Sequence, residues 1–122
     1  MIGTILAYAA ATAFISLGLG ALAAPKASSL QYGLATEDED ALAYVRALGV
    51  RDLVLGLALF AFSLAREGNA AAIVAELGAL IGFSDFLIVA SRRGNAARRN
   101  LVIHGAGTIG LLGVWIAIRL GS

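Results

Sequence analysis

The chain has 122 residues, of which 60% are hydrophobic and only 14% are charged, and its mean hydropathy is +0.88. Soluble domains are roughly 45–50% apolar and about 25% charged, and a domain this short could not hide so much apolar surface from water. The net charge of +1 is uninformative about nucleic acid, and none is expected as a partner because no basic face is left once the helices are placed. The absence of cysteine excludes disulfides, thiolate metal sites and thiol catalysis.

Four apolar stretches are long enough, or nearly so, to cross a bilayer, which takes about 20 residues. The first, 2–24, carries no charge and ends at Pro25. We interpret it as a retained helix rather than a cleaved signal peptide, because no Lys or Arg precedes it and it is longer than a usual signal core. The other three stretches are 48–64, 70–90 and 101–120. The expected fold is all-α: a polytopic membrane protein with a four-transmembrane-helix bundle in one domain, 1–122.

The connections carry signals for helix ends. Thr36 and Glu39 have the spacing of a capping box, which predicts that the second helix begins outside the bilayer at about residue 37. Gly68-Asn69 predicts a helix stop followed by an N-cap, and therefore a tight hairpin between the second and third helices. A basic loop at 91–100 is expected between the third and fourth helices.

Lysine and arginine gather on one side of this arrangement. The expected loops 25–47 and 91–100 carry Lys26, Arg46, Arg92, Arg93, Arg98 and Arg99. The opposite side carries only Arg66 and Arg119. Because cytoplasmic loops are enriched in Lys and Arg, we expect both loops in the cytoplasm, N-out/C-out topology and a plasma (inner) membrane location. The same loops could also contact anionic membrane lipids.

Ionisable residues also fall within the expected spans, where a charge costs several kcal/mol unless it is paired or hydrated. Arg51 and Asp52 lie in the first turns of the second apolar stretch. At 1.5 Å per residue, Asp85 lies about 7 Å and His104 about 5 Å from the cytoplasmic ends of their helices. Three helices therefore bring these groups to one level below the cytoplasmic surface. Glu76 is nine residues from Asp85, so it points to roughly the opposite face, where it faces a partner protomer, is protonated, or reaches the outer interface.

These groups are the candidate catalytic residues. We predict Asp85 as acid or base, His104 as its partner, Arg51 as anion stabiliser and Asp52 as the group that orients Arg51. Each has a structural alternative: an ion pair between Arg51 and Asp85, Asp52 as a helix-favouring residue or partner of Arg46, and His104 as a packing residue. No spacing motif requires a metal, and no cofactor is expected.

Helical phase extends this prediction to candidate ligand-binding residues. Tyr8, Thr12 and Ser16 form a weakly polar stripe on the first helix that could line the same interior. Thr108 and Trp115 share the face of His104 on the last helix.

The last apolar stretch also contains a dinucleotide-binding pattern, at 105–110. That pattern is meaningful only between a strand and a helix of a βαβ unit, so we reject it here. The small residues Ala106, Gly110, Gly113 and Ala117 instead predict a packing face, within the bundle or between protomers of a homo-oligomer.

The run 44–56, with its Gly-x-Arg-Asp core at Gly49 to Asp52 and a further glycine one turn later, resembles a signature of the DUF4267-like family. The positions around Gly82 to Asp85 and His104-Gly105 are also similar. That family consists of small four-helix integral membrane proteins of unknown function. The resemblance implies the same fold and no activity.

Three functions fit the sequence. The first is an intramembrane enzyme or binding protein for an apolar small molecule, such as a lipid, isoprenoid or polyketide. The second is a small oligomeric proton-coupled transporter, similar in size to the small multidrug exporters. Their essential carboxylate lies in the first helix, which has no charge here, so Glu76 would have to carry the proton. The third is a structural or accessory subunit whose charges tie the helices together.

Overall fold

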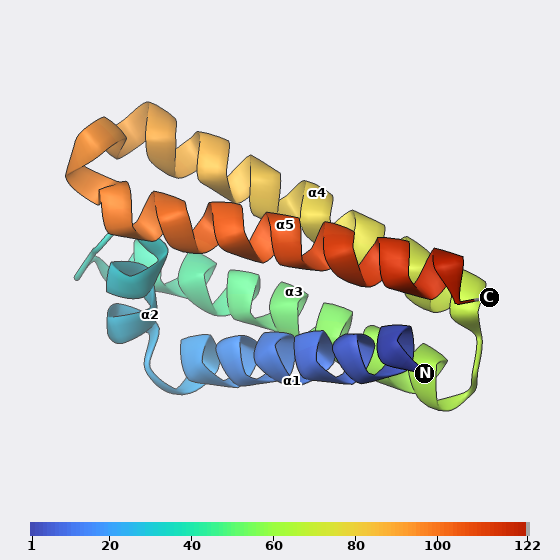
Figure 1. Cartoon of the computed structure of the whole chain (residues 1–122). Coiled ribbons are helices and arrows are strands. Elements are labelled where there is room, and N and C mark those ends of the chain that lie inside the picture. The colour runs from blue at the N-terminus through green and yellow to red at the C-terminus, as the bar shows by residue number, and fades with distance from the viewer. Residues whose placement is uncertain (122) are drawn as a thin grey trace.

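The computed structural model describes residues 1–121, and within that range it contains helices and turns but no strand. The elements are α1 (Ile2–Ala23), α2 (Pro25–Tyr32), α3 (Glu39–Leu64), α4 (Gly68–Arg93), the short 3-10 helix η1 (Gly94–Ala97) and α5 (Arg98–Leu120). Figure 1 shows the four long helices side by side, with both termini at one end of the bundle and α2 at the other. The expected all-α four-helix bundle is confirmed.

Three continuous helical stretches are long and apolar enough to cross a membrane: Ile2–Ala23, Glu39–Leu64 and Gly68–Leu120. The third reverses direction at η1, so it contains the antiparallel helices α4 and α5 (Figure 1). Each long helix also presents large apolar side chains outward, among them Ile5, Val54, Leu80 and Ile109. Such a surface suits lipid as its solvent.

Glycines bring α1 and α3 into direct backbone contact. A Cβ atom added at Gly18 would lie 2.6 Å from the carbonyl oxygen of Gly49, and one added at Gly56 would lie 2.8 Å from the backbone nitrogen of Ile15. Real Cβ atoms do not approach backbone so closely, so these positions require glycine. We call this contact the α1–α3 seam.

The end of the bundle that holds the termini is tightly packed with small residues. Gly3 of α1 lies against the backbone of Ala117 of α5, where an added Cβ would be 2.8 Å from the carbonyl oxygen. The buried core nearby draws on four helices: Ala7, Ala11, Leu59, Ala71, Ala75 and Val114. We call this the closed end.

The segment 25–47 departs from the sequence prediction. Pro25 ends α1 as expected, but it also begins α2, which Gly33 closes with a φ of 108°. Proline is favoured at the first position of a helix and glycine just past the last, so this pair brackets a helix. The expected loop therefore contains the unpredicted helix α2 in addition to the predicted early start of the next long helix.

The start of α3 also differs from the expected capping box. Asp38 is the N-cap, and its carboxylate accepts a hydrogen bond from the backbone nitrogen of Ala41 at 2.8 Å. The hydroxyl of Thr36 instead accepts from the backbone nitrogen of Asp38. A carboxylate at the N-cap also interacts favourably with the helix dipole.

Two further connections are shorter than predicted. At the α3–α4 hairpin, Arg66 adopts a positive φ of 60° and the backbone nitrogen of Glu67 donates to the carbonyl of Phe62. This bond closes a Schellman motif with Arg66 in the usual glycine position, so Gly68 already belongs to α4. The expected loop 91–100 is reduced to η1, because α4 continues to Arg93.

Candidate functional site

A cavity of about 610 Å³ lies among the long helices at the α2 end of the bundle. Small-molecule pockets in proteins are roughly 300–1,000 Å³ in volume, so the cavity has the size of a ligand site. Its walls are mostly apolar and come from all five α-helices and from the segment between α2 and α3. The larger apolar side chains are Phe14, Leu17, Leu34, Val45, Leu48, Ile81, Ile103 and Leu111.

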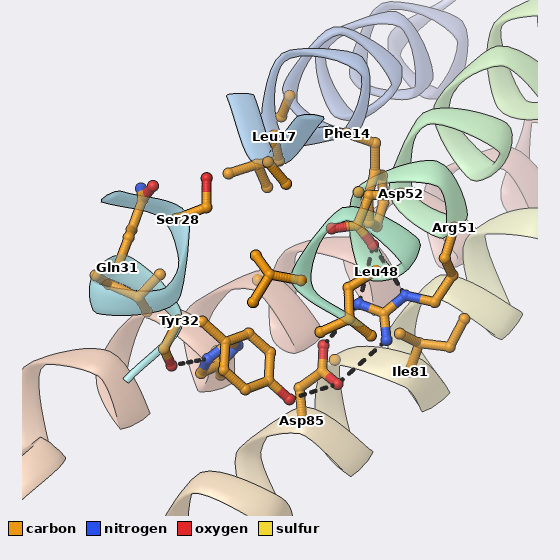
Figure 2. A pocket seen from close by; sticks show the side chains of 18 of the residues that line it. Phe14, Leu17, Ser28, Gln31, Tyr32, Leu48, Arg51, Asp52, Ile81 and Asp85 are labelled. Atoms are coloured by element: carbon orange, nitrogen blue, oxygen red, sulfur yellow. Dashed lines mark hydrogen bonds and ion pairs between the residues drawn. The ribbon is translucent and has the colours of Figure 1, made fainter. Parts of the chain in front are cut away.

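One wall of the cavity carries an ion-pair network centred on Arg51 (Figure 2). Its Nη2 lies 2.9 Å from Oδ1 of Asp52 and 3.0 Å from Oδ2 of Asp85. Its Nε donates to the same oxygen of Asp52 at 3.0 Å, and its Nη1 donates to Oδ1 of Asp85 at 3.3 Å. Asp85 is buried, with 7% of its surface exposed. The guanidinium therefore joins α3 to α4 through charge-assisted hydrogen bonds.

Tyr32, at the end of α2, completes the network. Its hydroxyl donates to Oδ1 of Asp85 at 3.0 Å. Burial, together with the neighbouring Asp85 carboxylate, raises the pKa of the Tyr32 phenol well above its usual value, so the group stays protonated and remains a donor. The sequence reasoning missed Tyr32. A proline at the start and a glycine just past the end, at Pro25 and Gly33, could have predicted the short helix that carries Tyr32.

His104 joins the network through the backbone of Tyr32. Its Nε2 lies 2.8 Å from the carbonyl oxygen of Tyr32, and the two rings meet edge to face with centroids 4.8 Å apart. A carbonyl only accepts, so Nε2 carries the proton. Asn100 donates to the carbonyls of Leu30 and Gln31. Side chains of α5 therefore hold the free carbonyls at the end of α2.

The two carboxylates differ in how fully they are used. Both oxygens of Asp85 accept hydrogen bonds, from Arg51 and Tyr32. Asp52 uses only Oδ1, and among residues 1–121 its Oδ2 receives no hydrogen bond. Figure 2 shows this second oxygen pointing away from Arg51 toward the interior of the cavity. Asp52 is therefore the carboxylate that a molecule in the cavity would meet. In the described part of the chain, no group of three or more His, Asp or Glu side chains is arranged to hold a metal ion.

The polar stripe predicted on α1 does not line the cavity. Tyr8 packs on Phe60 with ring centroids 5.2 Å apart, the hydroxyl of Thr12 donates to the carbonyl of Tyr8, and Ser16 is exposed on the outer surface. A helix hydroxyl can bond the carbonyl four residues earlier, so Thr12 needs no polar interior. The cavity side of α1 is apolar instead: Ala10, Ala13, Phe14, Leu17 and Ala21.

Of the two ligand-binding residues predicted on α5, only Thr108 lies on the cavity wall. Thr108 lines the cavity, and its hydroxyl donates to the carbonyl of His104 at 2.9 Å. Trp115 lies two turns further along and packs against the closed-end core. Its indole nitrogen is buried without a hydrogen-bond partner among residues 1–121. Trp115 is therefore outside the cavity wall.

The predicted packing stripe on α5 is largely not a packing face within the bundle. Ala106, Gly110 and Gly113 are exposed on the outer surface, and a Cβ added at either glycine would meet nothing within 4 Å. Only Ala117 makes a helix contact, with Gly3. Glu76 is likewise exposed, on α4 and away from the cavity wall.

The cavity opens sideways between α1 and α5. Residues of both helices line it and are also exposed on the outer surface: Ala13, Leu17, Ile103, Gly107 and Gly110. Gln31 of α2 and Tyr44 of α3 are likewise exposed lining residues, so the cavity also meets the surface at the α2 end. Gly107 and Gly110 have no side chain to fill the gap, and no atom lies within 4 Å of a Cβ placed on either. In a membrane, this opening would face the lipid chains. We call it the α1–α5 opening.

A family model described as a domain of unknown function, DUF4267, matches residues 11–118. The matched region begins within α1 and ends within α5, so it includes all or part of every helix that lines the cavity. The resemblance based on the Arg51-Asp52 run is thereby confirmed. No curated protein and no solved structure matches the chain.

Proposed function

This chain belongs to the DUF4267 family, whose function is unknown, and we propose that it binds an apolar small molecule within the bilayer and holds or converts it there. A lipid, an isoprenoid or a polyketide would have the required character. The observation that carries the proposal is the cavity itself: about 610 Å³, mostly apolar, open between α1 and α5, and bounded on one wall by the Arg51 network. Apolar walls with a few convergent polar groups are typical of ligand sites.

The proposed setting is the plasma (inner) membrane, with the α2 end in the cytoplasm. The exposed arginines near that end support this orientation: Arg46, Arg92, Arg93, Arg98 and Arg99. The chain has no native cysteine, so single introduced cysteines can test it. A cysteine at the exposed Asn95 should resist an impermeant maleimide added to intact cells, and one at Arg66 should react. The reverse pattern would contradict the orientation.

The proposed chemistry is centred on Asp52. Its free Oδ2 can accept a hydrogen bond or a proton from the polar end of a ligand, because a carboxylate within reach is a competent base. Asp85 has no free oxygen, so we assign it to holding Arg51 and Tyr32 in place. This exchanges the roles that the sequence suggested for the two aspartates. His104 becomes a positioning residue, which acts through the backbone of Tyr32.

The α1–α5 opening supplies the test. We expect Gly107→Phe and Gly110→Phe to fill the opening and to reduce the amount of co-purifying apolar molecule by at least about tenfold, measured by native mass spectrometry with lipid extraction. Neither substitution meets another atom within 4 Å at its Cβ, so folding should be preserved. Gly113→Phe is the matched control, because Gly113 is equally unobstructed but does not line the cavity. A protein that carries no apolar molecule, or equal loading in all three variants, would contradict the proposal.

A structural role is the second candidate, and the Arg51–Asp85 ion pair favours it because it joins α3 to α4 at a buried position. Under that role, removing a charge lowers stability and leaves no ligand to lose. Proton transport through Glu76 gains no support, since Glu76 lies on the outer surface rather than on the cavity wall.

A further inference from the structure

We infer that the molecule bound in the cavity carries a positively charged, hydrogen-bond-donating head, such as a protonated amine, on an apolar body. The inference rests on the function proposed above and names the class of molecule that the site would take. It follows from the charge of the network, the one free carboxylate oxygen and the shape of the opening.

The ion-pair network contains two carboxylates and only one guanidinium. Arg51 supplies one positive charge against the two carboxylates of Asp52 and Asp85. Among the described residues that line the cavity, Arg51 is the only Lys or Arg. Tyr32 keeps its proton, and His104 directs its Nε2 proton to the carbonyl of Tyr32 rather than to either carboxylate. In a low-dielectric cavity, an uncompensated negative charge strongly favours a cationic partner.

The hydrogen-bonding groups that remain free in the network also favour a cationic head. Every nitrogen of the Arg51 guanidinium already contacts a carboxylate oxygen, so no free cation is available to an anionic head. The unpartnered Oδ2 of Asp52 accepts and does not donate. An anionic head would meet this oxygen with like charge, and an alcohol would leave the negative charge in place. An ammonium supplies both the charge and the N–H donors.

The opening accommodates the apolar body. A flexible chain attached to a head beside Asp52 can leave the cavity between Leu17 of α1 and Gly107 or Gly110 of α5, and continue among the lipid chains. The cavity then needs to hold only the head and the first part of the chain. A single-chain amine amphiphile meets this requirement.

Three probes with the same chain and different heads test the inference: tetradecylamine, tetradecanol and tetradecyl phosphate. Each is titrated into nanodiscs of zwitterionic lipid that contain the protein, with empty nanodiscs as the blank for partition into lipid. Binding is measured from the increase in thermal stability, because a ligand that binds only the folded state raises it. We expect the amine to bind at least about tenfold more tightly than the alcohol, and the phosphate not to bind.

Asp52→Asn should weaken binding of the amine by at least about tenfold while leaving the alcohol nearly unchanged. The asparagine side chain keeps the shape of the aspartate and its acceptor toward Arg51. Glu76→Gln is the charge-matched control: it removes one negative charge from the outer surface of α4 and should change nothing.

The comparison of the three head groups uses the unmodified protein, so it does not depend on the folding of any variant. If the alcohol or the phosphate binds as tightly as the amine, the head-group inference is overturned and the proposed binding function stands. If amine binding survives Asp52→Asn, the inference is also overturned. If none of the three probes binds, the proposed function fails with it.

Discussion

The two sides of α1 use small residues in opposite ways. In the α1–α3 seam, Gly18, Gly49 and Gly56 let two backbones touch, and nothing larger than hydrogen fits. At the α1–α5 opening, Gly107 and Gly110 meet no other atom and leave space empty. The first arrangement stabilises the bundle through close packing, whereas the second creates a route into its interior. In lipid, a glycine on a helix therefore marks a contact or a gap, and only its neighbours decide which.

The largest expected effect separates these two kinds of glycine. Gly18→Val should destabilise the protein by more than about 3 kcal/mol, or prevent folding, because the new Cβ would lie 2.6 Å from backbone atoms that cannot move independently. Gly107→Val should change stability by less than about 0.5 kcal/mol, since its Cβ meets nothing. Unfolding by denaturing detergent in mixed micelles, followed by circular dichroism, measures both. Equal losses would show that the opening is in fact packed.

An intermediate effect is expected where α3 meets α4, a contact held by charge rather than by glycine. Asp85→Asn should cost about 2 kcal/mol, less than the roughly 3–5 kcal/mol of a fully broken buried pair, because Arg51 keeps Asp52. Glu76→Gln removes a charge from the same helix without breaking any contact in the described chain, and should be nearly neutral. Indistinguishable stabilities for the two variants would argue against a role of the network in holding α3 to α4.

The smallest effect is expected at α2. Tyr32→Phe removes one hydrogen bond to Asp85 and should cost about 1 kcal/mol. The pKa of Tyr32 is raised in the folded state. Above about pH 10 the phenol therefore ionises in the unfolded state but keeps its proton in the folded state. The stabilising contribution is therefore complete below about pH 10 and is lost as the pH rises further.

Absorbance gives an independent check on Tyr32. At about pH 11 the folded parent and the Tyr32→Phe variant should show equal tyrosinate absorbance, because Tyr32 does not ionise in the folded protein. A higher tyrosinate signal in the parent, by the amount of one tyrosine, would contradict a buried phenol bonded to Asp85.

The long helices could be predicted from apolar length alone, but their inward faces could not. In water, the apolar side of a helix faces the core, whereas in lipid both sides are apolar. The polar stripe of Tyr8, Thr12 and Ser16 was therefore a poor guide. The recurrence of small residues is a better one, because the buried face of α1 consists of Gly3, Ala7, Ala11, Gly18 and Ala21.

The site was predictable in part. The rise per residue places Arg51, Asp52 and Asp85 at one depth, and the structure brings these three together. The rise per residue does not show that both oxygens of Asp85 accept hydrogen bonds while one oxygen of Asp52 accepts none, because that depends on side-chain geometry. Tyr32 escaped notice because α2 is short and polar, and its position against α4 and α5 is set by tertiary contacts.

Trp115 gives the molecule a built-in optical reporter. It is the single tryptophan of the chain, and its indole packs against the closed-end core rather than the cavity. Its buried nitrogen lacks a hydrogen-bond partner among residues 1–121, so its emission should be blue-shifted. Fluorescence would therefore report melting of the closed end without responding directly to what fills the cavity. Paired with a probe at α2, it would show whether the two ends of the bundle unfold as one unit.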